Sequence, residues 1–494
     1  MNMTYKLLIM RNFRYTCFLL VFCLASFNSV AQNSYKITVR TNGFKDTVCY
    51  MGYYNGKFQY AKDTAKFDNK GTAIFENKSA ALDRGVYFII FPNKKHLDFV
   101  INKEQILNFD IDTSDIAGKA KVSGSKENQL FYEYNHSMSK LGGEYETLRK
   151  LEGKYKETND DSLKVVMSQM EGLNKKMLKI KDDFILNNSE TFVAKIFRLT
   201  TDPILPNPPI NEDGTSDSTF LYTYFKENYW KNMDFTDEAL VRTPVFHGRL
   251  ERFITQVIIQ HPDSVMKELD LLIKKTEITP DLFKYVVWYL TFHYETSQIM
   301  GHDAVFVHLV DTYYRTGKAF WVSETALNKI LQRADKLRPI LIGKIAPNMA
   351  LLDTNLNSYT QLWSIKAKYT IMVFWDPGCG HCKKELERIN VFWKEEGVKY
   401  DVKVYSICTD TNLTDWKNKI KEKQILEWIN VNGTRSALGN YQELYDVFST
   451  PLIFILDQEK KIIAKKLGAE ATTKFIPQWD ATRNENNMFN IENE

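Results

Sequence analysis

Hydrophobic and polar residues alternate over short stretches in the first quarter of the chain. Six runs rich in β-branched and aromatic residues follow one another between positions 34 and 124, and glycine, asparagine, aspartate and lysine separate them. The runs read YKITVRT, VCYMGYY, GTAIFE, GVYFIIF, HLDFVI and ILNFDI. Short apolar strands at this spacing predict a β-sandwich or small barrel over residues 32–125.

From residue 126 to residue 342 the apolar residues instead recur every three or four positions. The clearest segments read LFYEYNHSMSKL, DSLKVVMSQMEGLNKKMLKIKDDFIL and PDLFKYVVWYLTFHYE. This period predicts an all-helical domain over residues 126–342. One stretch, DPILPNPPINEDGTSDS at 202–218, contains four prolines and predicts a long surface loop.

Strand and helix patterns alternate over residues 343–480. KYTIMVFW has the length of a buried strand, CKKELERINVFWKEE has the helical period, and VKVYSIC, LTDWKNKIKEK and WINVN continue the alternation. TPLIFILDQEKKIIAKKLG predicts a β-hairpin about a polar turn at Asp457–Lys460. The sequence therefore predicts a multidomain protein whose C-terminal domain is an α/β sheet between helices, followed by a disordered tail at 481–494.

Composition and charge narrow the range of partners. The 494 residues suffice for about three domains. The 65 basic and 61 acidic residues nearly cancel and form no basic stripe, so we expect no nucleic acid partner. His293, His302 and His308 lie close together in the sequence, but helix capping and core packing explain them better than a metal site, and we expect no metal.

The first 31 residues have the pattern of a signal peptide. Three basic residues precede an apolar run from Tyr15 to Phe27, and Ser29 and Ala31 supply the small residues that signal peptidase requires, so the mature chain would begin at Gln32. Two alternatives are a lipidated cysteine in LVFC and an uncleaved anchor. The pattern predicts export to the periplasm or cell envelope.

Cleavage at this point would leave four cysteines in the mature chain, of which Cys379 and Cys382 form a CxxC pair. The pair could be a structural bridge, part of a metal site or a working redox pair. A bridge would close too short a loop to stabilise the fold much, and zinc would lack a second pair of ligands. Thiol exchange is therefore the preferred interpretation. Cys49 and Cys408 fit buried core positions, with a redox role as the alternative for Cys408.

The two cysteines of the pair should differ in reactivity. Cys379 falls where a helix is predicted to begin, and the backbone N–H groups and positive dipole end of a helix N-terminus favour a thiolate. Cys379 is therefore the predicted nucleophile. Cys382, one turn further on, is placed to attack a mixed disulfide at Cys379 and is the predicted resolving cysteine.

The C-terminal region resembles the thioredoxin superfamily, in particular the exported TlpA/ResA-like thiol-disulfide oxidoreductases. The resemblance rests on GKIAPNMALLDTNLNSYTQLW, on FWDPGCGHC and on YDVFSTPLIFILDQEKKII. It implies that Pro451 is a cis-proline facing the disulfide and that the backbone of Thr450 receives the substrate chain. The two preceding regions resemble uncharacterised β-rich and helical domains that accompany this module in Gram-negative envelope proteins.

The sequence also departs from this family. Gly378 and Glu387 stand where many relatives have tryptophan and proline, and His381 replaces the usual proline between the cysteines. A protonated His381 would favour the Cys379 thiolate. Val373 occupies the place of the buried aspartate of thioredoxin, which leaves Glu385 as the candidate base.

We therefore expect an exported oxidoreductase that exchanges thiols and disulfides with protein substrates through Cys379 and Cys382. Reduction is favoured over oxidation, the cysteine pair is the only redox group expected, and a membrane electron donor is a candidate partner. The alternatives are an envelope scaffold protein with an accessory thioredoxin module and a peroxiredoxin-like peroxidase, although a PxxxTxxC motif is absent.

Overall fold

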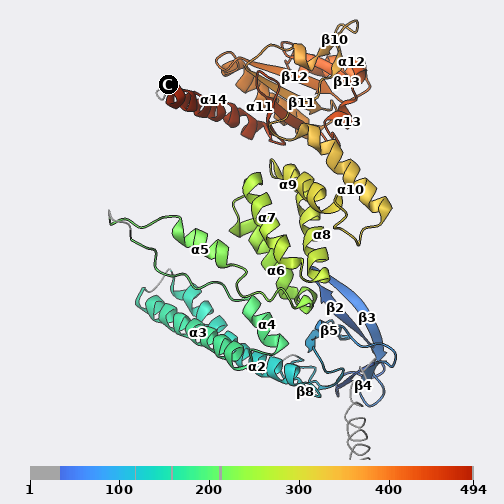
Figure 1. The fold of residues 1–494 in the computed structure, drawn as a ribbon, viewed down its shortest axis with the longest axis vertical. Helices are drawn as coiled ribbons and strands as arrows, with labels where there is room; N and C mark the ends of the chain where they lie inside the picture. Colours follow the sequence, from blue (N-terminus) through green and yellow to red (C-terminus); the bar gives the residue numbers. More distant parts are fainter. Residues whose placement is uncertain (1–33, 117, 157–159, 211–213, 492–494) are drawn as a thin grey trace, which may run out of the picture. The chain divides into compact units, whose positions relative to one another are not determined.

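The computed structural model describes residues 34–116, 118–156, 160–210 and 214–491, so the expected signal peptide, 1–31, lies outside the described residues. The chain divides into two compact units, Met1–Val257 and Ile258–Glu494, which are described in turn. Figure 1 labels the helices and strands of the chain. Within the described part of the chain, no helix has both the length and the apolar character that crossing a membrane would require.

Two four-stranded sheets form the first part of the N-terminal unit. Their strand orders are β4-β1-β7-β8 and β3-β2-β5-β6, and all neighbours are antiparallel except β1 and β7. The strands are β1 (Tyr35–Arg40), β2 (Val48–Asn55), β3 (Phe58–Lys66), β4 (Thr72–Asn77), β5 (Gly85–Ile90), β6 (His96–Ile101), β7 (Ile106–Asp110) and β8 (Lys121–Ser123).

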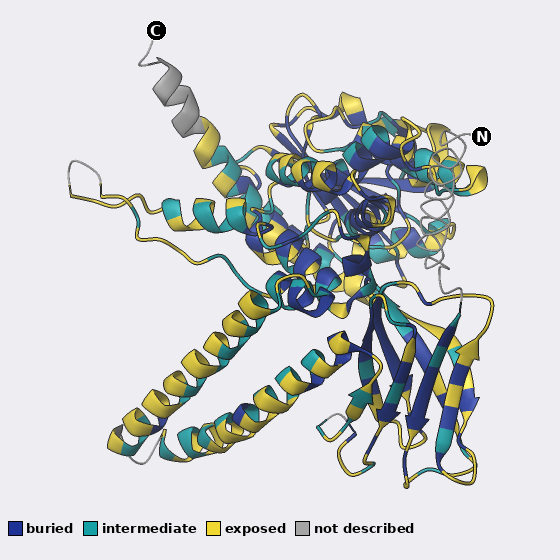
Figure 2. Cartoon of the chain, turned by 60° about the horizontal axis from the view of Figure 1, so that its bottom comes forward, coloured by how far each residue is buried: buried dark blue, intermediate teal, exposed yellow. Residues whose placement is uncertain are grey.

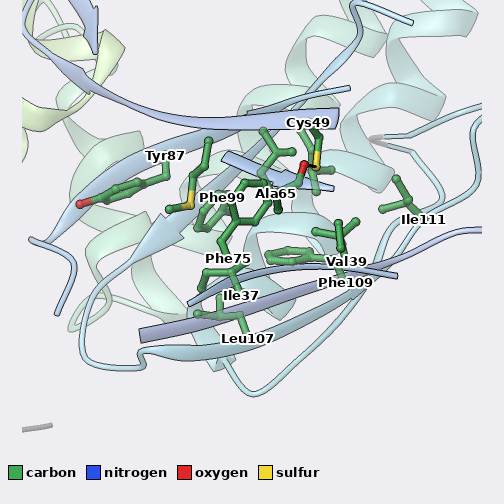
Figure 3. Close-up of a cluster of buried hydrophobic side chains, with 14 of the residues drawn as sticks. Ile37, Val39, Cys49, Ala65, Phe75, Tyr87, Phe99, Leu107, Phe109 and Ile111 are labelled. Carbon is green, nitrogen blue, oxygen red and sulfur yellow. Dashed lines mark hydrogen bonds between the residues drawn. The ribbon is translucent and has the colours of Figure 1, made fainter. Parts of the chain in front are cut away.

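Alternate residues of both sheets point into one shared core. Ile37 and Val39 of β1 contribute to it together with Phe75, Phe99 and Phe109 from the other strands (Figure 3). All five side chains are fully buried, which accounts for the period-two pattern of apolar residues in the sequence. The six predicted strands and the β-rich fold class are confirmed, and β3 and β8 are added to them.

Two long helices follow the sheets, α2 (Lys126–Tyr155) and α3 (Asp160–Asn187). Ser125 caps α2 by accepting a hydrogen bond from the backbone N–H of Asn128. The buried residues of α2 all lie between Glu127 and Leu141, and Figure 2 shows how much of both helices is exposed. The remaining helices of this unit are α4 (Phe192–Leu199), α5 (Phe220–Asn228), η1 (Glu238–Arg242), α6 (Pro244–Arg252) and the π-helical turn η2 (Phe253–Val257).

The described part of the proline-rich stretch between α4 and α5 contains no helix, as predicted. The expected helical domain 126–342 does not form one compact unit, however, because the division between the units falls after Val257. The helices beyond that point belong to the unit that contains the C-terminal sheet: α7 (Pro262–Thr276), α8 (Pro280–Thr296), α9 (His302–Leu309), η3 (Val310–Tyr314), α10 (Glu324–Leu337) and η4 (Arg338–Ile340).

A seven-stranded mixed sheet follows these helices, with the order β10-β9-β13-β12-β11-β14-β15. The central strands β11, β12 and β13 are parallel, and β14 and β15 form the predicted antiparallel hairpin. The strands are β9 (Ala350–Asp353), β10 (Tyr359–Gln361), β11 (Tyr369–Trp375), β12 (Val402–Cys408), β13 (Ile429–Leu438), β14 (Leu452–Leu456) and β15 (Ile462–Lys465), and the helices are η5 (Leu362–Ser364), α11 (Gly380–Glu395), α12 (Leu413–Glu422), α13 (Tyr441–Leu444) and α14 (Ala469–Ile491).

Every residue of β11 is buried, so this strand lies in the centre of the domain. Ile371, Val373 and Trp375 belong to one apolar cluster with Leu386 of α11 and Ile476 of α14. The predicted α/β architecture is confirmed. The expected disordered tail at 481–494 is wrong over the described residues 481–491, because α14 continues to Ile491.

Candidate functional site

The loop between β11 and α11 places Cys379 at the start of the helix. Within this loop the carboxylate of Asp376 accepts a hydrogen bond of 2.7 Å from the backbone N–H of Gly378. The backbone N–H of Cys379 donates to the carbonyl oxygen of Asp376 at 3.1 Å. Cys379 is the N-cap of α11, and its sulfur accepts a hydrogen bond of 3.3 Å from the backbone N–H of Cys382.

This environment favours the Cys379 thiolate. Burial would raise the pKa of the thiol, but hydrogen bonds from the thiol and backbone N–H of Cys382 outweigh it and bring the pKa below its usual value. Helix N-termini act in the same direction on a thiol. The sulfur of Cys379 is only partly buried, so an incoming disulfide can reach it.

Cys382 lies in the first turn of α11 and is completely buried. Burial, the largest cause, raises the pKa of its thiol to about 12. Both cysteines are free thiols in the structure. The pair therefore consists of a partly exposed thiol with a lowered pKa and a buried thiol with a raised pKa.

The loop before β14 brings Thr450 and Pro451 next to the cysteine pair. Strand β14 is antiparallel to β11, with Leu452 opposite Phe374. The bond between Thr450 and Pro451 is a cis peptide bond. The protonated Cys379 thiol donates to the carbonyl oxygen of Thr450, and the two atoms are 3.5 Å apart. The structure thus brings together four of the six predicted site residues.

The other two predicted residues are placed differently. The side chain of His381 is exposed in the first turn of α11. The carboxylate of Glu385 accepts a hydrogen bond from the backbone N–H of Ala469, where α14 begins, and lies 3.8 Å from the guanidinium of Arg388. Its visible role is to cap α14, and none of its hydrogen bonds in the described structure reaches either cysteine.

Two residues near the cysteine pair were not singled out from the sequence. Asp376 fixes the loop through the bonds above, and the Asp-Pro-Gly order before Cys379 is the signal that could have indicated such a turn. Trp375 is fully buried, and its indole N–H donates to the hydroxyl of Ser406 at 2.8 Å. No sequence motif could have indicated the contact between Trp375 and Ser406, because the two residues lie on different strands.

The remaining cysteines lie in the cores. Burial raises the pKa of both Cys49 and Cys408 to about 12. The Cys49 thiol donates to the carbonyl of Ala65 at 3.5 Å, and Cys408 lies opposite Trp375 in the sheet. Neither thiol is set up as a nucleophile.

The histidines noted in the sequence also have local partners. His308 bonds to the carboxylate of Asp270 at 2.9 Å, and His302 bonds to the hydroxyl of Ser297 at 2.9 Å. Among the described residues no group of three histidine, cysteine, aspartate or glutamate side chains could hold a metal ion.

A mixed sheet with parallel central strands, a helix that starts at a CxxC pair and an opposing X-Pro loop together define a thioredoxin-like domain with a thiol-disulfide oxidoreductase-like site. Residues 342–465 match the AhpC/TSA family, so this domain belongs to that family. Residues 35–131 and 204–338 match two domains of unknown function, DUF4369 and DUF5106.

Individual relatives cover different shares of this chain. "Thiol-disulfide oxidoreductase ResA" of Bacillus cereus is 26% identical over 140 residues, which are 28% of this chain and 75% of the relative. A solved domain of a possible thiol-disulfide isomerase from Cytophaga hutchinsonii is 34% identical and covers 29% of this chain and 97% of its own, with a TM-score of 0.28. A thioredoxin-like protein from Bacteroides caccae is 17% identical and covers 56% of this chain and 99% of its own, with a TM-score of 0.41. The C-terminal domain is thus homologous to ResA thiol-disulfide oxidoreductases.

Proposed function

We propose that the protein is an exported thiol-disulfide oxidoreductase that reduces disulfides in other proteins through Cys379 and Cys382. The observation that carries the proposal is the difference between the two thiols. Cys379 is accessible and has a lowered pKa, whereas Cys382 is buried and has a raised one. Such a difference separates the attacking sulfur from the resolving sulfur.

The reaction runs in two exchange steps. The Cys379 thiolate attacks one sulfur of the substrate disulfide, so a mixed disulfide forms and the other substrate sulfur leaves as a thiolate. Cys382 then loses its proton and attacks the sulfur of Cys379, which releases the second substrate thiolate. The substrate gains two electrons and the pair becomes a disulfide. A dithiol donor must return those electrons, and a membrane protein is the donor class that we propose.

The potential of the pair decides the direction of exchange. Known potentials run from about −270 mV for thioredoxin to about −180 mV for protein disulfide isomerase. We place this pair between these values, because the hydrogen bonds to Cys379 stabilise its thiolate and hence the reduced form. The resemblance to reductases favours reduction over oxidation as the cellular role.

Trapping tests this proposal. In the variant Cys382→Ser the second step is blocked, so mixed disulfides with substrate proteins should accumulate and should disappear under dithiothreitol. The double variant Cys379→Ser, Cys382→Ser should trap nothing, and Cys408→Ser is the matched control for loss of a buried thiol. Equal capture with and without Cys379 would contradict the proposal.

Two further assays address the alternatives. Peroxide consumption that depends on Cys379 would support the peroxidase alternative instead. Unchanged partner binding and phenotype after removal of both cysteines would support the scaffold alternative.

The export part of the proposal needs its own test. Sequencing the N-terminus of the mature protein from an envelope fraction should find a start at or near Gln32. A full-length product in the cytoplasm would contradict export.

A further inference from the structure

The second exchange step depends on how easily Cys382 loses its proton. The side chain is completely buried, and burial raises the pKa of its thiol to about 12. The candidate base Glu385 is bound to the backbone of Ala469 instead. A thiol must become a thiolate before it attacks a mixed disulfide, so a group that stabilises the Cys382 thiolate bears directly on the rate of this step.

Asp376 supplies such a group through its main chain. Burial is the largest influence on the pKa of Cys382, but the backbone N–H of Asp376 donates a hydrogen bond to the sulfur and lowers this pKa. The effect of a backbone N–H depends on where the chain holds it, because it has no side-chain rotation of its own. The geometry of the loop around Asp376 therefore matters for Cys382.

Two hydrogen bonds and a proline hold this loop in place. The carboxylate of Asp376 accepts a bond of 2.7 Å from the backbone N–H of Gly378, and its carbonyl oxygen accepts one of 3.1 Å from the N–H of Cys379. The second bond joins the ends of a four-residue turn, in which Pro377 fixes the φ angle of the second residue. Aspartate and asparagine suit the first position of such a turn, because their side chains accept a bond from the backbone two residues further on.

Gly378 lets the carboxylate come close to the main chain. A Cβ atom at this position would lie 3.2 Å from a carboxylate oxygen of Asp376, which is tighter than ordinary van der Waals contact. The turn before Cys379 is thus built around the side chain of Asp376.

The negative charge of Asp376 also acts on other groups. In addition to burial, this charge raises the pKa of the Cys408 thiol and of the Tyr441 hydroxyl. The contact through which Asp376 favours the Cys382 thiolate is its backbone N–H. The hydrogen-bonding capacity of the carboxylate and its charge can therefore be tested separately.

We propose that Asp376 is a positioning residue for the second exchange step: its carboxylate holds the turn, and the turn holds the N–H of Asp376 against the sulfur of Cys382. This N–H favours the Cys382 thiolate that attacks Cys379 and releases the substrate thiolate. The proposal rests on the proposed thiol-exchange function. Because asparagine can accept the same bond from Gly378, the charge of Asp376 is dispensable and its acceptor oxygen is not.

The two exchange steps can be followed separately with the aromatic disulfide dithiobis(nitrobenzoate). The Cys379 thiolate of the reduced full chain attacks it, so one nitrobenzoate thiolate leaves and the other half stays bound to Cys379 in a mixed disulfide. Cys382 then attacks the sulfur of Cys379, which releases the second nitrobenzoate thiolate and leaves the pair as a disulfide. Stopped-flow absorbance distinguishes the steps, because only the first accelerates with reagent concentration.

Two cysteine variants calibrate this assay. Cys382→Ser should show the first step alone. Release that remains in the double variant Cys379→Ser, Cys382→Ser comes from other cysteines and is subtracted.

Asp376→Ala should slow the second step about tenfold, as expected for loss of one hydrogen bond to a thiolate. The first step should stay within about threefold, since the Cys379 sulfur accepts its hydrogen bond from the N–H of Cys382. Asp376→Asn should keep both steps within about threefold of the native chain. Asp410→Ala is the matched control and should change neither step, because Asp410 holds a similar turn after β12 by accepting a bond of 3.1 Å from the N–H of Asn412.

The asparagine variant decides between positioning and proton transfer. Slowing of the second step in Asp376→Asn as strong as in Asp376→Ala would show that the charge is required, as for a base, and would overturn the positioning role. An unchanged second step in Asp376→Ala, or a first step slowed as much as the second, would overturn it too. If Asp376→Ala fails to fold, Asp376→Ser takes its place and should give an intermediate rate, because a hydroxyl accepts the bond from Gly378 more weakly. No release that depends on Cys379 in the native chain would instead overturn the thiol-exchange function itself.

Discussion

The ion pair between Lys465 and Asp303 offers a sharp test of how the C-terminal unit is stabilised. The two side chains are only 1% and 6% exposed, and they join the start of α9 to the end of β15. The ammonium of Lys465 also donates to the carbonyl of Ile340 at 2.6 Å. We consider the change Asp303→Asn, which keeps the shape of the side chain and removes its charge.

The loss of folding stability expected for Asp303→Asn follows from the burial of the Lys465 ammonium that remains. The Asp303→Asn variant would leave the Lys465 ammonium in the interior without a carboxylate, and breaking a buried pair in this way costs about 3 to 5 kcal/mol. The double variant Asp303→Leu, Lys465→Met removes both charges and should be within about 1 kcal/mol of the native chain or more stable. The exposed pair Lys474 and Glu470 provides the matched control, and Glu470→Gln should leave the free energy of unfolding almost unchanged, because water screens this pair.

The cost should also depend on pH. Burial lowers the pKa of Lys465 from its usual value, and Asp303 opposes this effect. Loss of the carboxylate must therefore lower the pKa further. The unfolded state then binds more protons than the folded state at alkaline pH, so the free energy of unfolding rises with pH. The difference in the free energy of unfolding between the native chain and Asp303→Asn should therefore be largest near pH 7 and should become smaller toward pH 10.

Urea unfolding followed by tryptophan fluorescence measures these effects. Of the nine tryptophans only Trp230 precedes Ile258, so the signal reports mainly on the C-terminal unit. A loss of about 3 kcal/mol should lower the midpoint by about 1 to 1.5 M urea for a unit of this size. A shift no larger than that of the Glu470→Gln control, or a deficit that stays constant up to pH 10, would refute the reasoning.

Three further predictions concern the cysteine site. In a pH titration followed by thiolate absorbance, the step that belongs to Cys379 is the one that disappears in Cys379→Ser, and its pKa should lie below that of an ordinary cysteine. Cys382→Ala should raise this pKa, because Cys379 loses the thiol that donates a hydrogen bond to it. An unchanged pKa in Cys382→Ala would assign the lowered value to the helix N-terminus alone. Glu385→Gln should cost about 1 kcal/mol of stability through the weaker cap at Ala469 and should leave the exchange rate within about twofold, whereas a hundredfold loss would identify Glu385 as the base. His381→Pro should move the equilibrium with a glutathione buffer to a more negative potential, and no movement would show that this exposed imidazole has no influence on the pair.

The sequence predicted the elements that are buried on both faces. β11 could be recognised because all seven of its residues are apolar or form part of the core, and the β14–β15 hairpin because a polar turn separates two apolar runs. β3 was missed for the opposite reason. Most of its nine residues are exposed, so FQYAKDTAK shows no apolar alternation, and only its pairing with β2 makes it a strand.

The cysteine pair could be predicted because its chemistry depends on neighbours in sequence. The N-cap position and the hydrogen bond from Cys382 to Cys379 follow from one turn of helix. The role of Glu385 could not be predicted, because Ala469 lies 84 residues further along the chain. The division after Val257 was missed for a similar reason, since helical periodicity says nothing about which neighbour a helix packs against.

Two ion pairs show why that division matters for the site. Arg333 of α10 binds Asp446, which precedes the loop that contains Thr450, and Asp303 of α9 binds Lys465 at the end of the hairpin that begins just after Pro451. Buried and partly buried ion pairs contribute little net stability compared with apolar contacts, but they allow few alternative arrangements of the groups that they join. The two pairs thereby join helices α9 and α10 to the two sides of the segment that contains the proline loop. Because the carbonyl of Thr450 contacts the Cys379 thiol, we expect loss of the ion pair between Arg333 and Asp446 to affect the cysteine pair through this loop.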